Sequence, residues 1–285
     1  MVIYVIKNSG ERDVFDKSKI IQSCLRAGAR LEDAEKIADE VEKKIYDGIR
    51  TRDVMKLVKE NLRKLKLHPV YVRYPLKDAL FKLNPDNYEF EYYIANLFRY
   101  LGYEAQRSLL PKLRGFCVDH EIDVFLLKDG KAGFVEVKHR SREDKYVHLD
   151  VVMYHYARFL DFVKGYKEGK VNFKGKPDSC WVVTNTKFTY HAIKYSQCYG
   201  IKLLGWNFPY DNGINAIIER YKAYPLTLFN IKSYIREILF EKYGVIDAND
   251  LYNMDKEVLK KYLKKDYNSV IKKLYMVMEE PSLKK

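Results

Sequence analysis

The spacing of hydrophobic and polar residues changes character along the chain. Residues 1–15 alternate as expected for a small hairpin, with VIYVIK and RDVF on either side of a polar NSGE turn. Apolar residues then recur at helical spacing up to about residue 83, and Gly48 supplies a stop signal between two helices. Four helices are predicted: from Asp16 or Ser18 to about Ala29, from Glu32 to Tyr46, from the capping residue Thr51 through Leu65, and from Pro69 to Leu83.

The segment NPDN (84–87) ends this pattern. Strands alternate with helices beyond it, which is typical of an α/β core with a mixed sheet. From about residue 223 onward only short helices are predicted, so the expected division is 1–84, 85–224 and 225–285. In the middle segment we expect a helix at 88–101, a strand at 103–108, a hairpin, a helix at 149–166, a strand at 179–184, a helix near 189–199 and a strand at 201–206.

The predicted hairpin, EIDVFLLKDGKAGFVEVKH (121–139), carries charged residues among its valines. Its Asp129-Gly130 pair favours a two-residue type I′ turn, in which both residues have positive φ. Paired residue numbers then sum to 259, so Asp123 faces Glu136 and Glu121 faces Lys138. These four charged side chains share one face of the hairpin, because side chains alternate along a strand. The other face is apolar, with Ile122, Val124, Val135 and Val137.

Two carboxylates that face each other, with Cβ atoms about 5 Å apart, repel and weaken a sheet. Mg²⁺ takes one or two carboxylates from a protein and completes its octahedron with waters and a substrate phosphate. Asp123 and Glu136 therefore predict a metal site, in which Lys138 would position the attacking water or offset charge on a five-coordinate phosphorus. The alternative is a solvent-facing hairpin with an ordinary Glu-Lys pair.

The helix that follows the hairpin carries further polar candidates. Asp150, His155 and Arg158 fall on this helix and could border a substrate channel. A mixed charged face on a surface helix explains them more simply, so they are not part of the predicted site.

The composition of the chain favours a polyanionic binding partner. The net charge is +13, from 52 Lys and Arg against 39 Asp and Glu, and suits a nucleic-acid partner, although a solvated lysine-rich surface would give the same value. The four cysteines have neither CxxC spacing nor paired histidines, which disfavours zinc and disulfide frameworks and indicates a reducing compartment. No run of 18 apolar residues occurs, and the N-terminus is unlike a signal peptide. We therefore expect a cytoplasmic protein without a membrane partner.

Residues 88–210 resemble the PD-(D/E)xK nuclease superfamily, specifically its Mrr-like restriction endonuclease branch. The resemblance rests on a glutamate-bearing helix that ends in LGY, then IDVFLL, a turn and FVEVKH. It implies a restriction-endonuclease-like mixed β-sheet core flanked by helices, with Mg²⁺ or Mn²⁺ as cofactor and DNA as substrate, often in a homodimer. Ile122 stands where the proline of the family name would be. By this resemblance Asp123 and Glu136 hold the metal, Lys138 is catalytic, and Glu91, or alternatively Glu89, points to the metal.

Residues 1–83 resemble an ATP-cone, a mainly helical nucleotide-sensing module. The segments that carry the likeness are VIYVIKNSGERDVFDKSKI, YDGIRTRDV and VYVRYPLKDAL. The resemblance implies ATP or dATP as a regulatory ligand, although KNSG stands where the family commonly has Lys-Arg-Asp-Gly. A helical domain with ordinary surface lysines is the alternative. The implied roles are phosphate contacts from Lys7 and Lys19, a base or amide contact at Thr51, a contact from Lys77, and a pocket lined by Val5, Asp13 and Phe15.

The last segment, 225–285, is predicted to be a small basic helical module that binds DNA or dimerises. Taken together, the segments predict a metal-dependent DNA endonuclease whose activity responds to ATP or dATP. The alternatives are a nucleotide-responsive DNA-binding protein with an inactive nuclease fold, and an RNA-processing nuclease.

Overall fold

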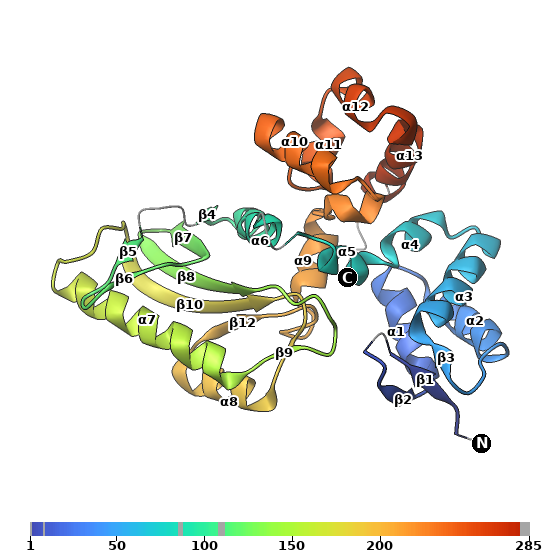
Figure 1. Ribbon diagram of the computed structural model, residues 1–285, viewed down its shortest axis with the longest axis horizontal. Helices are drawn as coiled ribbons and strands as arrows, with labels where there is room; N and C mark the ends of the chain where they lie inside the picture. The colour runs from blue at the N-terminus through green and yellow to red at the C-terminus, as the bar shows by residue number, and fades with distance from the viewer. Residues whose placement is uncertain (1, 8, 85–87, 108–111, 280–285) are drawn as a thin grey trace. The chain divides into compact units, whose positions relative to one another are not determined.

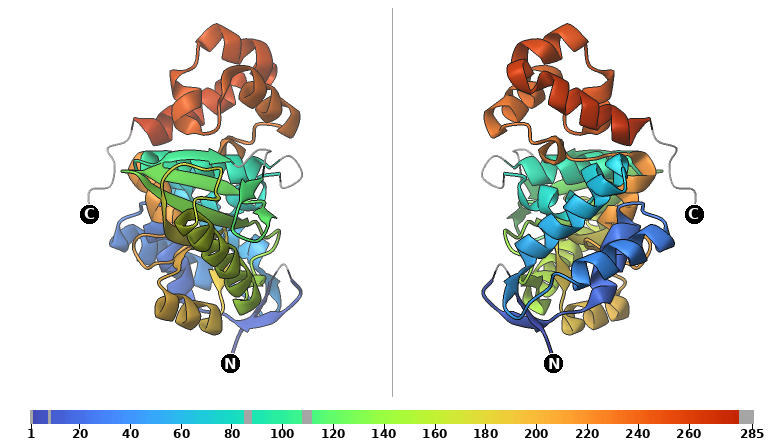
Figure 2. Two further views of the ribbon diagram at one scale, coloured as in Figure 1. Left: turned by 90° about the vertical axis from the view of Figure 1, so that its left-hand side faces the viewer. Right: turned by 90° about the vertical axis from the view of Figure 1, so that its right-hand side faces the viewer.

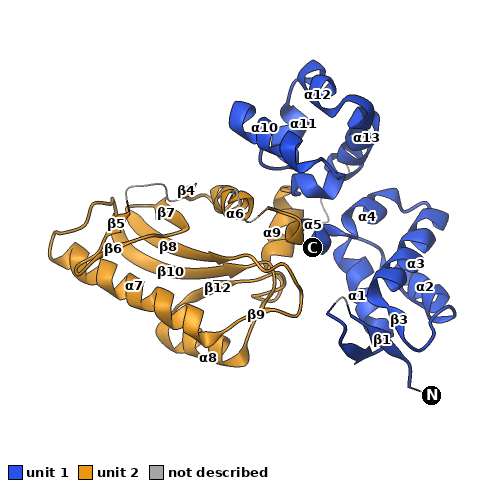
Figure 3. Ribbon diagram, viewed as in Figure 1, with its two compact units in different colours: residues 1–79, 224–285 blue, residues 80–223 orange. Residues whose placement is uncertain are grey.

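The computed structural model describes residues 2–7, 9–84, 88–107 and 112–279 (Figure 1). The chain forms two compact units, one of residues 1–79 with 224–285 and the other of residues 80–223 (Figure 3). The first and last predicted segments thus fall in the same unit. In the described part of the chain, no helix is both long enough and apolar enough to span a membrane.

The unit of residues 80–223 is built on a five-stranded mixed sheet in the order β12-β10-β8-β7-β4. The strands are β4 (Glu104–Arg107), β7 (Val124–Lys128), β8 (Lys131–Lys138), β10 (Lys176–Thr184) and β12 (Lys202–Leu204). β4, β7 and β8 pair antiparallel, whereas β10 is parallel to both β8 and β12. The central strand β8 is buried from Ala132 to Val137, which explains its apolar run AGFV (132–135).

Helices cover both faces of this sheet (Figure 1). On one face lie α7 (Leu149–Lys167) and α8 (Tyr190–Tyr199), which pack on each other, with α7 against β10. On the other lie α6 (Glu89–Tyr100), against β4 and β7, and α9 (Ile214–Tyr221), which contacts α6. The predicted α/β class with a mixed sheet flanked by helices is confirmed.

The β7–β8 hairpin has the predicted register. Asp129 and Gly130 have φ of +51° and +72°, and the ladder runs from Lys128 opposite Lys131 to Val124 opposite Val135. The predicted alternation fails before β7, however, because the chain leaves the strand at that point. Ile122 is buried with Ala132, Phe134 and Phe162, which is the Glu136 side of the sheet and not the side of Val124. The predicted pairing of Glu121 with Lys138 therefore does not form.

Two pairs of two-residue strands in this unit were not predicted, because two residues carry no readable alternation. β5 (Leu113–Arg114) pairs with β6 (Asp119–His120), and β9 (Tyr146–Val147) pairs with β11 (Lys187–Phe188). The first pair lies in the segment between β4 and β7, directly before Asp123.

The N-terminal part of the other unit contains a small sheet in the order β2-β1-β3, with β1 (Tyr4–Ile6), β2 (Arg12–Val14) and β3 (Ile49–Arg50). The predicted fourth helix is two helices, because Pro75 has no amide hydrogen to continue the first. The helices are α1 (Lys17–Arg26), α2 (Leu31–Glu42), α3 (Thr51–Lys64), α4 (His68–Arg73) and α5 (Leu76–Phe81), whose last two residues already belong to the unit of residues 80–223. The core of the first four helices includes Ile37, Val41, Val58 and Leu62.

The C-terminal part of the same unit is a cluster of short helices, as predicted (Figure 2). The helix α13 packs against α4, and the 3-10 helix η1 also contacts α4. The two ends of the chain therefore share one unit. The elements are η1 (Leu226–Phe229), α10 (Ser233–Tyr243), α11 (Ala248–Asn253), α12 (Lys256–Leu263), η2 (Lys264–Asp266) and α13 (Tyr267–Met278).

Candidate active site

The structure brings Asp123 and Glu136 together where the β7–β8 ladder ends. Asp123 directly precedes β7, and its Oδ2 accepts a hydrogen bond of 2.6 Å from the Val137 amide. Glu136 lies one residue past the last ladder pair, on the side of β8 that α7 covers, and is only 5% exposed. The Asp123 carboxylate thus takes the place of a backbone acceptor at the end of the ladder, next to the carboxylate of Glu136.

The surroundings of Asp123 raise the pKa of its carboxyl group. Burial raises it most, the negative charge of Glu136 raises it further, and together they outweigh the donated Val137 amide and bring the pKa of Asp123 to about 7. Two carboxylates that disfavour each other's charge are a common feature of metal and acid-base sites. A bound cation would relieve this repulsion.

Each oxygen of Glu136 already has a cationic neighbour. Lys138 Nζ lies 2.5 Å from Oε1, and Arg158 Nη1 donates to Oε2 at 2.8 Å. His155 Nδ1 is 3.7 Å from the same Oε2. His155 is fully buried and the Arg158 side chain is 18% exposed, so these two residues do not belong to an exposed charged face of the helix, whereas Asp150 is exposed as that explanation expects. His155 and Arg158 face the sheet because they are three residues apart on the side of α7 that packs on β8.

Glu91, and not Glu89, carries charge close to this site. Burial raises the pKa of Glu91, and the charges of Glu121 and Glu136 contribute, against an ion pair of 2.7 Å from Arg107 Nε. Glu89 Oε2 instead accepts from the Asn84 amide at 2.7 Å, just before its own helix. Of the two alternatives, Glu91 is the one whose charge acts on Asp123, while its own carboxylate is held by Arg107.

The donor set fits a hard divalent cation. Among the described residues, no group of three or more His, Cys, Asp and Glu side chains is arranged to hold a metal ion. Mg²⁺ needs only one or two carboxylates and takes its other ligands from water and substrate. Asp123 and Glu136 are two such donors, and a cation would reduce the repulsion by Glu136 that contributes to the raised pKa of Asp123.

Other polar candidates beside the site have structural partners. His120 Nε2 lies 2.9 Å from Asp161 Oδ2, and the same carboxylate accepts from the amides of Cys117 and Val118. The hydrogen bond to Asp161 raises the pKa of the Cys117 thiol, which leaves it unsuited to act as a nucleophile. Asp161 therefore ties the β5–β6 hairpin to α7.

The predicted nucleotide residues cluster in part. Ile6 pairs with Arg50, so Lys7 and Thr51, the next residues on each strand, leave the small sheet at the same end. Asp13 links Lys7 and Lys19, at 3.2 and 3.1 Å. Thr51 is the first residue of α3 and Arg50 precedes it as cap, one position earlier than predicted.

This arrangement suits an anion, since two lysines lie near each other and the first-turn amides of a helix lack intrahelical partners. Val5 is buried, and Phe15 packs against the N-terminal core. Lys77 lies on α5.

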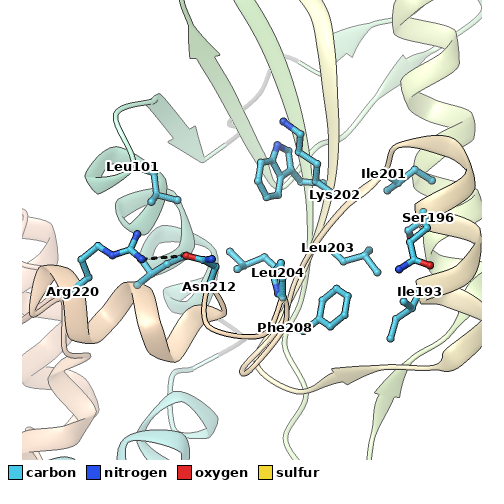
Figure 4. A pocket seen from close by; sticks show the side chains of 14 residues that line it. Leu101, Ile193, Ser196, Ile201, Lys202, Leu203, Leu204, Phe208, Asn212 and Arg220 are labelled. Atoms are coloured by element: carbon cyan, nitrogen blue, oxygen red, sulfur yellow. Dashed lines mark hydrogen bonds between the residues drawn. The ribbon is translucent and has the colours of Figure 1, made fainter. Parts of the chain in front are cut away.

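A pocket of about 420 Å³ lies beside the edge strand β12 (Figure 4). Its lining is mainly apolar and includes Leu101, Trp181, Leu204 and Phe208. Arg220 donates to Asn212 at 3.1 Å along its rim. None of the predicted site residues lines this pocket, so it is separate from the candidate active site.

Comparison with known proteins identifies the domain at the N-terminus. Residues 3–76 match the ATP cone domain. Two transcriptional repressors NrdR, from Caldicellulosiruptor saccharolyticus and Caldicellulosiruptor bescii, are 38% and 35% identical over 71 residues. These matches span 22% of this chain and 46% of each repressor. The ATP-cone expectation is therefore confirmed.

Two further similarities extend beyond that domain. An uncharacterized protein of Archaeoglobus fulgidus is 34% identical over 170 residues, which is 59% of this chain and 88% of that protein. A crystal structure of a protein of unknown function, AF1548, matches 68% of this chain and 99% of its own, with a TM-score of 0.55 and 30% identity. The chain thus has an N-terminal ATP cone domain and belongs to the same family as the Archaeoglobus fulgidus protein.

Proposed function

We propose that the protein is a metal-dependent nuclease that hydrolyses DNA phosphodiester bonds and whose activity responds to ATP or dATP. The observation that carries the proposal is the convergence of Asp123, Glu136 and Lys138 at the end of the hairpin ladder. The resemblance of residues 88–210 to Mrr-like nucleases supports it, because these are the three positions that match the superfamily's Asp, Glu and Lys.

Each residue has a role that follows from its position. Asp123 and Glu136 would hold Mg²⁺ or Mn²⁺, which when bound polarises a phosphoryl oxygen and lowers the pKa of a coordinated water. Lys138 is 32% exposed on the side chain and ends β8, so its ammonium can reach a phosphate that lies over the carboxylates. There it would orient water and offset the charge that develops on the phosphoryl oxygens.

The charge of the chain suits the same substrate. With a net charge of +13, the protein would attract the phosphate backbone without reading its sequence. Such binding releases counterions, and we expect its affinity to fall steeply with salt. This term would supply most of the binding energy before any specific contact forms.

The ATP cone domain would supply regulation. Lys7 and Lys19 would exchange their ion pairs with Asp13 for the phosphates of ATP or dATP, beside the start of α3. The nucleotide would then bias the activity or assembly of the nuclease unit.

The NrdR similarity favours a second candidate. A nucleotide-responsive DNA-binding protein could use the same ATP cone and the same basic surface while its nuclease fold is inactive. The two candidates differ only in whether Asp123, Glu136 and Lys138 act on the bound DNA.

A plasmid-nicking assay separates them. The full chain is incubated with supercoiled DNA in Mg²⁺ or EDTA, with and without ATP and dATP, and compared with Asp123→Asn and Lys138→Met. Glu121→Gln is the matched control, because it removes an exposed carboxylate two residues from Asp123. Linear, nicked and branched DNA and a single-stranded RNA then define the substrate.

We expect Mg²⁺-dependent nicking that Asp123→Asn and Lys138→Met abolish and Glu121→Gln retains. Cleavage that survives both site substitutions would disprove the assignment of the active site. Tight DNA binding without cleavage on any substrate would favour the repressor-like candidate.

A further inference from the structure

Both oxygens of Glu136 are engaged by side chains of the protein itself. Lys138 Nζ is at Oε1, and Arg158 Nη1 is at Oε2, 2.8 Å away. A divalent cation that binds Glu136 must come close to at least one of them, and the like charges repel each other. The two cations differ in how firmly they are held, and this difference identifies which one moves.

Arg158 is fixed at three points. Besides Glu136, its Nη1 donates to the Glu121 carbonyl at 3.2 Å, and its guanidinium carbon lies 4.3 Å from the centroid of the Tyr154 ring. Within the described part of the chain, the Lys138 ammonium takes part in the pair with Glu136 alone. Lysine has a flexible stem and a strongly hydrated head, whereas the planar guanidinium is pre-organised for several donors at once.

His155 explains why Oε2 needs a permanent donor. Its Nε2 lies 3.1 Å from the Phe134 carbonyl, which can only accept, so Nε2 carries the hydrogen and Nδ1 presents a lone pair. This Nδ1 is buried, has no hydrogen-bond partner among the residues that the structure describes, and lies 3.7 Å from Glu136 Oε2. Two acceptors would face each other in a dry environment if Arg158 did not bind Oε2.

We propose that Arg158 is a positioning residue that holds Oε2 of Glu136 inward and thereby leaves Oε1 as the metal-binding oxygen, while Lys138 gives way when the metal enters. The inference rests on the metal site of the proposed function and assigns its two cations different roles. Lys138 competes with the metal for Oε1, and Arg158 orients the ligand that the metal uses.

The two roles predict opposite effects of removing one positive charge. Lys138→Met should bind Mn²⁺ about five- to tenfold more tightly, because a competing cation is gone. Arg158→Met should bind Mn²⁺ at least about tenfold more weakly, because the unsupported carboxylate turns away from His155. Binding of Mn²⁺ to the full chain, measured by calorimetry or electron paramagnetic resonance, reports on this without any cleavage assay.

Chemical rescue distinguishes a direct effect of the missing guanidinium on Mn²⁺ affinity from a loss of folding in the variant. Guanidinium ion should restore Mn²⁺ affinity to Arg158→Ala but not change that of Lys138→Met, with sodium chloride as the ionic-strength control. Arg158→Lys keeps the charge but loses the planar guanidinium that lies over Tyr154 while its Nη1 donates to both Glu136 and Glu121, and should bind with intermediate affinity. Circular dichroism establishes that each variant is folded.

Tighter or unchanged Mn²⁺ binding by Arg158→Met would overturn the role of Arg158. The same holds if Arg158→Lys binds Mn²⁺ with the affinity of the parent, or if Arg158→Ala is folded and guanidinium does not restore its Mn²⁺ affinity. A different result bears on the proposed function itself. Absence of Mn²⁺ binding by the parent, or binding that survives Asp123→Asn, would remove the metal site altogether.

Discussion

Replacement of Asp123 by asparagine is expected to stabilise the unit of residues 80–223, and to do so more strongly as the pH rises. Asparagine removes the charge that Glu136 repels, and its side-chain oxygen can still accept the Val137 amide. Residues selected for a metal site commonly cost stability when the metal is absent. The substitution should therefore separate stability from function.

The magnitude follows from the pKa. Burial and Glu136 raise the pKa of Asp123 from 3.8 to about 7, so the folded state binds more protons than the unfolded state between these values. The stability of the parent then falls as the pH rises through that window. About three pKa units correspond to about 4 kcal/mol, and partial solvent contact of the carboxylate lowers the expected gap above pH 7 to about 2–4 kcal/mol. The gap should vanish below about pH 4.

Urea unfolding between pH 5 and pH 8 in EDTA measures the gap. Trp181 and Trp206 are the two tryptophans of the chain and both belong to the unit of residues 80–223, so their fluorescence follows that unit. Glu121→Gln is the control and should stay within about 0.5 kcal/mol of the parent. Addition of Mg²⁺ should stabilise the parent and not Asp123→Asn. A variant no more stable than the parent at pH 8, or a gap that is constant with pH, would refute the reasoning.

Three further predictions concern other parts of the chain. Asp161→Asn should destabilise the unit of residues 80–223 by about 1–3 kcal/mol at pH 7. Burial alone would raise the pKa of Asp161, but the hydrogen bonds that its carboxylate accepts outweigh burial and lower that pKa. The stabilisation by Asp161 is therefore lost on acidification, and the difference between variant and parent should shrink as the pH falls below 4. Gly165→Ala should cost about 1–3 kcal/mol in urea unfolding, because a Cβ there would lie 2.8 Å from the Phe116 amide; a cost near zero would contradict this packing. Lys7→Gln should weaken ATP binding by about tenfold in calorimetry, whereas substitution of Lys43, an exposed lysine at the C-terminal end of α2, by Gln should not. Equal effects would argue against a phosphate contact at Lys7.

The parts of the site that could be predicted from the sequence depend on local chemistry. Asp129-Gly130 determines the turn through the backbone preferences of two residues, and the turn determines the register that sets Asp123 against Glu136. No tertiary contact is needed for that inference. The ladder's early end was not predictable in this way, because Ile122 leaves the strand to enter a core formed with Phe162 of a distant helix.

His155 and Arg158 were considered and left out of the predicted site for a related reason. Both lie on α7, whose exposed residues include Met153, Tyr154 and Leu160, so its sequence does not separate an apolar buried face from a polar exposed one. Only the packing of α7 on β8 shows that the polar pair faces inward. A buried carboxylate on the sheet needs partners, and this need was the one available signal that polar residues of the next helix would turn toward it.

The dual role of the Asp123 carboxylate decides how its function should be tested. Because Oδ2 accepts the Val137 amide at the end of the ladder, Asp123→Ala would leave a buried donor without a partner, in addition to removing a metal ligand. An unsatisfied buried amide costs about 1–3 kcal/mol, whereas asparagine keeps the acceptor. Asp123→Ala should therefore be less stable than Asp123→Asn by about that amount at every pH, in the same tryptophan-detected unfolding. If the two variants were equally stable, the hydrogen bond to Val137 would contribute nothing and alanine would serve equally well as a test of metal binding.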